Sequence, residues 1–191
     1  NIVYHEAIPG NWSKWTGSAW VSLGTGMNNT VYRLAIDAAG NLYAAGDFTL
    51  AGGVTNTVRI AKWNGTSWLP LGTGLNAGTG YALGISPDGL VYVGGSFTAA
   101  GGLSVADRFA VWNGTTWAHV DIDFPGTPII YAIVFSGNDM YIGYSTAGTA
   151  TTSQSQTVTN NGSTTAYPKF VFKRSGGTTA RLEYIKNEPT G

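Results

Sequence analysis

The sequence predicts an all-β protein built from β-propeller blades, because two patterns recur along it at a blade-length spacing. The hexapeptide Trp-x-Gly-x-x-Trp occurs three times, at residues 15–20, 63–68 and 112–117. Each copy is followed by segments in which apolar residues alternate with small or polar ones. The first tryptophans of the three copies lie 48 and 49 residues apart. A repeat of this length accommodates four short antiparallel strands, which is one blade.

The first half of the repeat predicts two strands joined by a tight turn. In the second copy, apolar residues alternate with small residues over 81–86, which is the period of a half-buried strand. Pro87-Asp88-Gly89 then favours a turn, because proline presets one φ angle and glycine accepts the positive one. The run over 91–97 is rich in valine and aromatic residues and predicts the second strand.

The second half of the repeat predicts a hairpin that carries the tryptophans. A glycine-containing loop over 99–107 leads to a third strand over 108–112. Asn113-Gly114 favours a type I′ turn, which needs a positive φ at both central positions. The fourth strand is expected to begin near Trp117. A β-solenoid of hairpins is the alternative architecture, although solenoid coils are usually shorter than this repeat.

Repeat boundaries and shifts in composition divide the chain into four segments. About three blade equivalents are expected, starting with a half blade and ending with the complementary half near Ser145. The expected segments are an N-terminal segment 1–14, propeller-like repeats 15–146, a Thr/Ser/Asn-rich linker 147–165 and the start of a truncated C-terminal β-sandwich 166–191. Propellers close with about four to eight blades. Self-association, or missing blades of a parent chain, is therefore expected, with the last hairpin of one copy completing the first hairpin of another.

Composition excludes several classes of function. Ten basic and ten acidic residues balance, and only 10% of the chain is charged, so nucleic acid and anionic membranes are poor partners. There is no cysteine, which excludes disulfides, thiolate catalysis and zinc–thiolate sites. No apolar run reaches 18 residues, so membrane insertion is not expected.

The repeats resemble those of bacterial surface proteins and phage tail proteins. The resemblance rests on Tyr-Ala-Leu-x-Ile-x-Pro-Asp-Gly-x-Val-Tyr-Val-Gly-Gly-Ser-Phe, then Ala-Gly-Gly and Arg-Phe-Ala-Val-Trp-Asn-Gly-Thr-Thr-Trp, and covers about residues 15–145. Residues 161–184 resemble the start of the C-terminal β-sandwich of distal-tail or baseplate proteins of siphophages and prophages. The resemblance implies a location in the virion or at a cell surface, other tail proteins as partners, and no catalytic residues.

Aromatic and basic residues at repeat positions are the candidate ligand contacts. A tryptophan face can cover the apolar face of a pyranose, but its recurrence at one blade position favours packing between blades. Trp12 lies outside the repeat. Arg59 and Arg108 share one repeat position, where an arginine closing over the blade hairpin is the structural alternative. The candidates for ligand binding are Trp12, Trp20, Trp68, Trp117, Arg59 and Arg108.

Metal sites are not expected from the acidic residues. Asp37, Asp47 and Asp88 do not form the Asp-x-Asp-x-Asp-Gly run of a calcium loop. Asp88 precedes a glycine in a turn, where aspartate commonly accepts hydrogen bonds from its own backbone. We therefore expect these residues to support turns, and we expect no cofactor.

The sequence also contains no clear pattern of catalytic residues. Asp121 and Asp123 could face the same side of a strand, but no second acidic cluster accompanies them. The histidines, His5 and His119, form no Ser-His-Asp pattern. The expected function is thus a non-enzymatic structural or receptor-binding component of a phage tail that attaches to a surface glycan. The alternatives are a lectin-like propeller of a secreted bacterial surface protein and, less favoured, a glycan lyase or hydrolase.

Overall fold

The computed structural model describes residues 4–8, 11–104, 108–120, 122, 124, 126–146, 156–157 and 171–172. These residues form strands, turns and loops, and no helix occurs among them, which confirms the all-β prediction. The described residues accordingly contain no helix that is long and apolar enough to span a bilayer.

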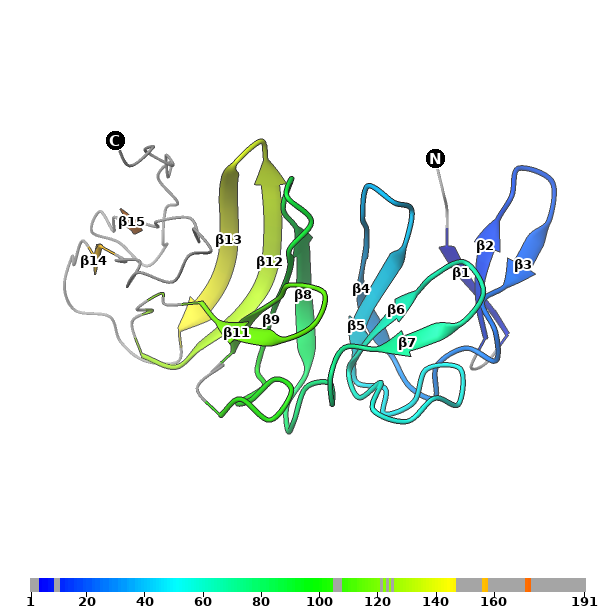
Figure 1. Ribbon diagram of the computed structural model, residues 1–191, viewed down its shortest axis with the longest axis horizontal. Coiled ribbons are helices and arrows are strands. Elements are labelled where there is room, and N and C mark those ends of the chain that lie inside the picture. Colours follow the sequence, from blue (N-terminus) through cyan, green and yellow to red (C-terminus); the bar gives the residue numbers. More distant parts are fainter. Residues whose placement is uncertain are drawn as a thin grey trace.

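Two complete four-stranded antiparallel sheets form the centre of the molecule (Figure 1). In each sheet the strands are arranged in chain order, as in a propeller blade. The first sheet contains β4 (Val31–Ile36), β5 (Leu42–Gly46), β6 (Ile60–Trp63) and β7 (Trp68–Pro70). The second contains β8 (Gly80–Ile85), β9 (Val91–Gly95), β10 (Phe109–Trp112) and β11 (Trp117–His119).

An incomplete sheet lies at each end of this pair. The N-terminal sheet contains β1 (Tyr4–Ile8), β2 (Asn11–Trp15) and β3 (Trp20–Ser22). The other is the hairpin of β12 (Pro128–Ser136) and β13 (Asp139–Thr146). The last sheet has the two strands predicted for it, whereas the N-terminal sheet has three strands and not the predicted hairpin alone. The N-terminal segment, expected to match the repeat poorly, supplies β1 as a third strand that pairs with β2.

Few residues beyond β13 are described. β14 (Gln156–Thr157) lies in the expected linker and β15 (Val171–Phe172) in the expected β-sandwich, and the two pair antiparallel. The remainder of the expected linker and sandwich, 147–155, 158–170 and 173–191, lies outside the described residues.

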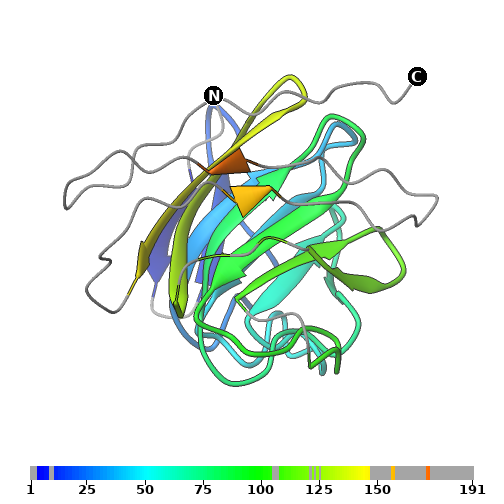
Figure 2. The same ribbon diagram turned by 90° about the vertical axis from the view of Figure 1, so that its left-hand side faces the viewer.

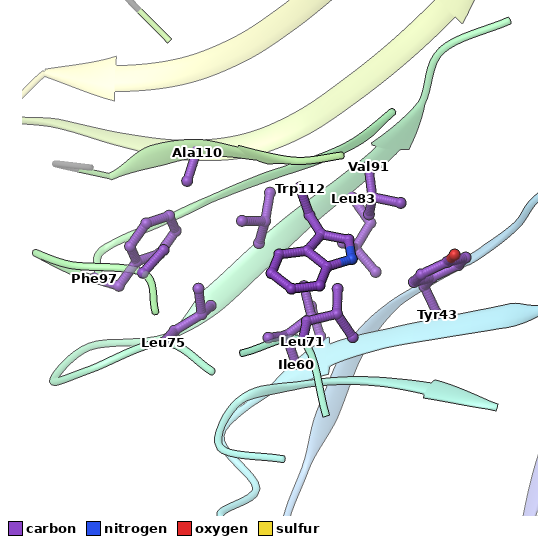
Figure 3. Packing of buried hydrophobic residues seen from close by; sticks show 12 residues of the cluster. Tyr43, Ile60, Leu71, Leu75, Leu83, Val91, Phe97, Ala110 and Trp112 are labelled. Carbon is purple, nitrogen blue, oxygen red and sulfur yellow. The ribbon is translucent and has the colours of Figure 1, made fainter. Parts of the chain in front are cut away.

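The sheets are stacked face to face in chain order (Figures 1 and 2), and β5 and β9 of the two central sheets are buried on both faces. Along β5, Leu42 and Ala44 point into a core shared with the N-terminal sheet, whereas Tyr43 and Ala45 point into a core shared with the next sheet. Figure 3 shows this second core, where Tyr43 lies close to Trp112 from β10. A strand buried on both faces needs apolar or small residues throughout, which explains the runs Leu-Tyr-Ala-Ala-Gly and Val-Tyr-Val-Gly-Gly.

The first strand of each repeat lies at the inner edge of its sheet. β4 and β12 both contact β8. The first strands of three successive repeats therefore lie side by side, although they are far apart in the sequence. This arrangement is that of blades around a propeller axis. The described residues form an open fan of blades and not a closed ring.

The tryptophan hairpins differ from the expected type I′ turn. Trp112 pairs with Trp117, which leaves a loop of four residues between the strands. Gly114 has φ 101°, but Asn113 does not have a positive φ. Instead, Asn113 Oδ1 accepts hydrogen bonds from the amides of Thr115 and Thr116, both at 2.9 Å. The side chain of asparagine thus closes the turn by a backbone-like hydrogen bond, and only glycine needs the left-handed region.

Candidate functional site

Three tyrosines occupy matching positions on the three inner strands. Tyr32 lies on β4, Tyr81 on β8 and Tyr131 on β12. At each of them the pairing with the neighbouring strand shifts by one residue, so that the tyrosine is the extra residue of a β-bulge. A bulge interrupts the alternation of a strand and redirects one side chain. The same irregularity therefore turns one tyrosine per blade out of the buried sheet faces.

The three side chains form a continuous aromatic row. The ring centroids of Tyr32 and Tyr81 lie 5.3 Å apart, and those of Tyr81 and Tyr131 lie 5.4 Å apart. The two outer members remain accessible, with 41% of Tyr32 and 44% of Tyr131 exposed. We call these three residues the tyrosine row. Aromatic rings at this separation attract one another, so the row is held in place by its own contacts as well as by the bulges.

Asp47 fixes one end of the row. The Tyr32 hydroxyl donates a hydrogen bond of 3.1 Å to Asp47 Oδ2, and the Thr79 hydroxyl donates to Oδ1 of the same carboxylate. The hydrogen bond to Asp47 and the negative charge of its carboxylate raise the pKa of Tyr32. Because Thr79 lies just before β8, this carboxylate also joins the first central sheet to the second.

Arg33 places a positive charge beside the row. Its guanidinium donates to the backbone carbonyl of Tyr131 at 3.4 Å, although the two residues are 98 positions apart. A second, equally long hydrogen bond reaches the carbonyl of Tyr32. Through these two bonds Arg33 links β4 with β12 at the positions of the bulges.

The row presents several kinds of group that can contact a ligand. It offers aromatic faces, phenol hydroxyls, one guanidinium and one carboxylate, and it holds no serine, cysteine or histidine nucleophile. No group of three or more His, Cys, Asp or Glu side chains suited to a metal ion occurs among the described residues. The arrangement can stack on and hydrogen-bond to a neutral polyhydroxylated molecule.

The repeated tryptophans have structural surroundings. Trp68 is only 2% exposed, and its indole N–H donates to the Leu23 carbonyl at 2.9 Å. Trp117 repeats this contact with the Leu71 carbonyl at 2.8 Å. Trp20, the equivalent residue of the N-terminal sheet, is 42% exposed and contacts Trp15 at 5.3 Å between centroids. None of these residues belongs to the tyrosine row, and Trp12 packs beside the core of the N-terminal junction.

The two candidate arginines share an unusual backbone conformation. Arg59 and Arg108 have φ values of 62° and 64°, a left-handed conformation that non-glycine residues seldom adopt. Arg59 donates from its guanidinium to the Leu75 carbonyl at 3.3 Å, in the segment that leads to the next blade. Backbone hydrogen bonds at both positions connect the loop before the third strand to the end of the second strand. The backbone bonds give both positions a structural role, and the printed side-chain contact of Arg59 goes to the connection toward the next blade.

Asp37 and Asp88 support turns, as expected, whereas Asp47 accepts hydrogen bonds from the hydroxyls of Tyr32 and Thr79. Asp37 Oδ1 accepts hydrogen bonds from the amides of Ala39 and Asn41, at 3.0 and 2.8 Å. Asp88 accepts from the Ser86 hydroxyl within the turn between β8 and β9. Asp121 and Asp123 lie outside the described residues, as does the side chain of His5. His119 ends β11, so the structure does not bring it to the tyrosine row.

A hollow of about 290 Å³ lies between the N-terminal sheet and the first central sheet. Lys14, Thr16 and Ser22 contribute polar groups to it, and Trp63 contributes an aromatic surface. Its size and lining suit a small polar molecule. This hollow lies at a single junction between two sheets, whereas the tyrosine row extends over three blades. The tyrosine row is therefore the more extended of the two candidate binding surfaces.

Sequence reasoning missed the tyrosine row, although a signal was present. A tyrosine stands near the start of the first strand in all three repeats, even in the third copy, where much of the repeat is lost. An aromatic residue kept at a position that the buried core does not use indicates a role at the surface. Searches against protein-family models and against curated protein sequences find no match to this chain. The interpretation of the site therefore depends on its geometry and chemistry.

Proposed function

We propose that this chain is a non-enzymatic structural and receptor-binding component of a phage tail, and that it attaches to a host-surface glycan through the tyrosine row. The observation that carries the binding part of the proposal is the continuous row formed by Tyr32, Tyr81 and Tyr131 on three successive blades. The assignment to a tail follows from the resemblance of the repeats and of residues 161–184.

A glycan is the ligand that matches this surface best. Aromatic faces cover the apolar faces of sugar rings, and hydroxyl groups of the sugar can hydrogen-bond to phenols and charged groups at the edge. Arg33 and Asp47 supply one charge of each sign, so the row carries no excess charge that would select a polyanion. A row that extends over several blades can contact several sugar units of one chain.

The same surface would serve a lectin-like propeller of a secreted bacterial surface protein. Both alternatives place the protein outside the cytoplasm or on a virion and require the same binding chemistry. They differ in their partners, because a tail component also contacts other tail proteins. Isolation of the native assembly, followed by identification of the proteins that accompany the chain, distinguishes the two.

Binding is tested by screening the purified chain on an array of bacterial surface polysaccharides, followed by titration calorimetry with each glycan that it retains. We expect Tyr81→Ala to weaken binding at least tenfold, which is about 1.4 kcal/mol, because the central ring contacts both neighbours. Leu69→Ala is the matched control, since Leu69 is 38% exposed but lies on β7, outside the row. Unchanged affinity in Tyr81→Ala, or retention of no glycan by the wild-type chain, would overturn the proposal.

A further inference from the structure

The two ends of the fan present sheet faces whose counterparts are buried at the junctions between the described sheets. Tyr43 and Tyr92 occupy the same position in the second strands of the two central sheets, and they are 5% and 0% exposed because the following sheet packs on them. Tyr141 is their equivalent on β13, and it is 39% exposed. Its partner across the hairpin, Val134, is 59% exposed. We call Tyr141 and Val134 the tyrosine end face.

The other end presents the complementary side of a blade. In the central sheets, the hairpin tryptophans point toward the preceding sheet, where Trp68 is 2% and Trp112 9% exposed. Their counterparts on the N-terminal sheet are Trp20, which is 42% exposed, and Trp15, which is partly exposed. We call Trp15 and Trp20 the tryptophan end face.

We propose that the tyrosine end face of one molecule docks on the tryptophan end face of a second copy of this chain. The junctions within the chain supply the template: Figure 3 shows Tyr43 of one sheet beside Trp112 of the next, within one continuous core. Tyr141 and Trp15 occupy the corresponding positions at the two ends of the fan. Two copies joined head to tail reproduce this pairing, and their balanced net charge of zero does not oppose it.

The contact involves sheet faces and not strand edges. The last hairpin of one copy was expected to pair with the first hairpin of another, but the edge of β2 is already paired with β1. Face docking remains open at both ends, because apolar side chains are exposed there. Val134 replaces the small residues Ala35 and Gly84 of the central sheets, so two copies approach less closely than two sheets of one chain. The association is therefore expected to be reversible and to increase with protein concentration.

Head-to-tail docking makes a prediction that symmetric docking does not. Each molecule uses two different faces, so a change in either face stops self-association. A Tyr141→Glu molecule keeps its tryptophan end face, and a Trp20→Glu molecule keeps its tyrosine end face. Each variant alone should therefore remain monomeric. An equimolar mixture should form a heterodimer, in which the tyrosine end face of Trp20→Glu docks on the tryptophan end face of Tyr141→Glu.

Sedimentation velocity of the full chain and of both variants over a range of concentrations tests the proposal. We expect concentration-dependent association of the wild type, monomers of each variant alone, and a dimer in the mixture. Leu69→Glu, on an exposed position outside both end faces, is the control and should associate like the wild type. Unchanged circular dichroism and unfolding temperatures show that the variants are folded. A monomeric wild type, self-association of either variant alone, or no dimer in the mixture would overturn the proposal.

Discussion

At the scale of single residues, Tyr43 shows how a buried polar group is accommodated between two blades. It is 5% exposed, and its hydroxyl donates to Asp37 Oδ2 at 3.2 Å. Burial, together with the charge of Asp37 and the hydrogen bond to it, raises the pKa of Tyr43 to about 12. For Asp37, burial raises the pKa, but hydrogen bonds from Asn41 and Tyr43 outweigh it, so the pKa lies below 3.8. The pair is thus held as a neutral phenol and a charged carboxylate.

Alkaline pH should weaken the fold through Tyr43. The phenol ionises near pH 10.0 in the unfolded chain but only near pH 12 in the folded protein. Its contribution to stability is therefore complete below pH 10 and is lost as the pH rises toward 12. We expect the free energy of unfolding, measured in urea, to fall less between about pH 8 and about pH 11 in Tyr43→Phe than in the wild type. Equal losses in both proteins would show that Tyr43 does not carry this dependence.

At the scale of the strand and its turns, the tryptophan hairpin is seated on glycine loops. Trp117 lies against Gly72 and Gly101, and a Cβ atom added at Gly101 would overlap Cδ1 of the indole. Trp68 contacts Gly24 and Gly52 in the same way one repeat earlier. These contacts explain why each repeat combines a tryptophan hairpin with an Ala-Gly-Gly loop. The hairpin and the loop are one packing unit, although about 15 residues separate them along the chain.

Two glycines separate the cost of backbone conformation from that of packing. Gly101 and Gly137 have φ values of 59° and 58°, but a Cβ atom at Gly137 would meet nothing within 4 Å. Gly137→Ala should therefore cost about 1 kcal/mol for the left-handed backbone alone. Gly101→Ala should cost about 1–3 kcal/mol more, because Trp117 must move. Urea denaturation of both variants measures the difference, and equal costs would argue against the seating of Trp117 on Gly101.

At the scale of the whole molecule, small residues control how closely the blades stack. Gly94 lies on β9, and a Cβ atom there would overlap Ile130 of β12. The equivalent residue of the first central sheet is Ala45, which is fully buried. The two junctions therefore use different combinations of small and large residues to fill the same space, as close packing requires.

Gly94→Ala should destabilise the protein by about 1–3 kcal/mol, even though alanine is usually more favourable than glycine in a strand. The φ angle of Gly94 is not positive, so the cost arises from Ile130 and not from the backbone. The double variant with Ile130→Val should be less destabilised than the sum of the two single variants. Additive effects, measured as free energies of unfolding, would show that the two residues do not share this contact.

The sequence by itself determined the class of the fold, the length of the blade and the positions of its strands. The predicted strand over 91–97 is observed as β9, and that over 108–112 is observed as β10. These features follow from local rules, because alternation and turn residues act within a few positions of one another. The same rules failed at Asn113, where a side-chain hydrogen bond replaced the backbone conformation of the expected turn.

Only the tertiary structure decided where the candidate site lies. Tyr32 and Tyr131 lie 99 residues apart, and nothing in their own neighbourhoods indicates that both contact Tyr81. Their row requires the bulges, which depend on pairing with the next strand, and the stacking of blades, which depends on cores shared between sheets. The tryptophans are prominent in the sequence because the packing of every blade needs them. The tyrosines form a continuous row because stacking places one bulge beside the next.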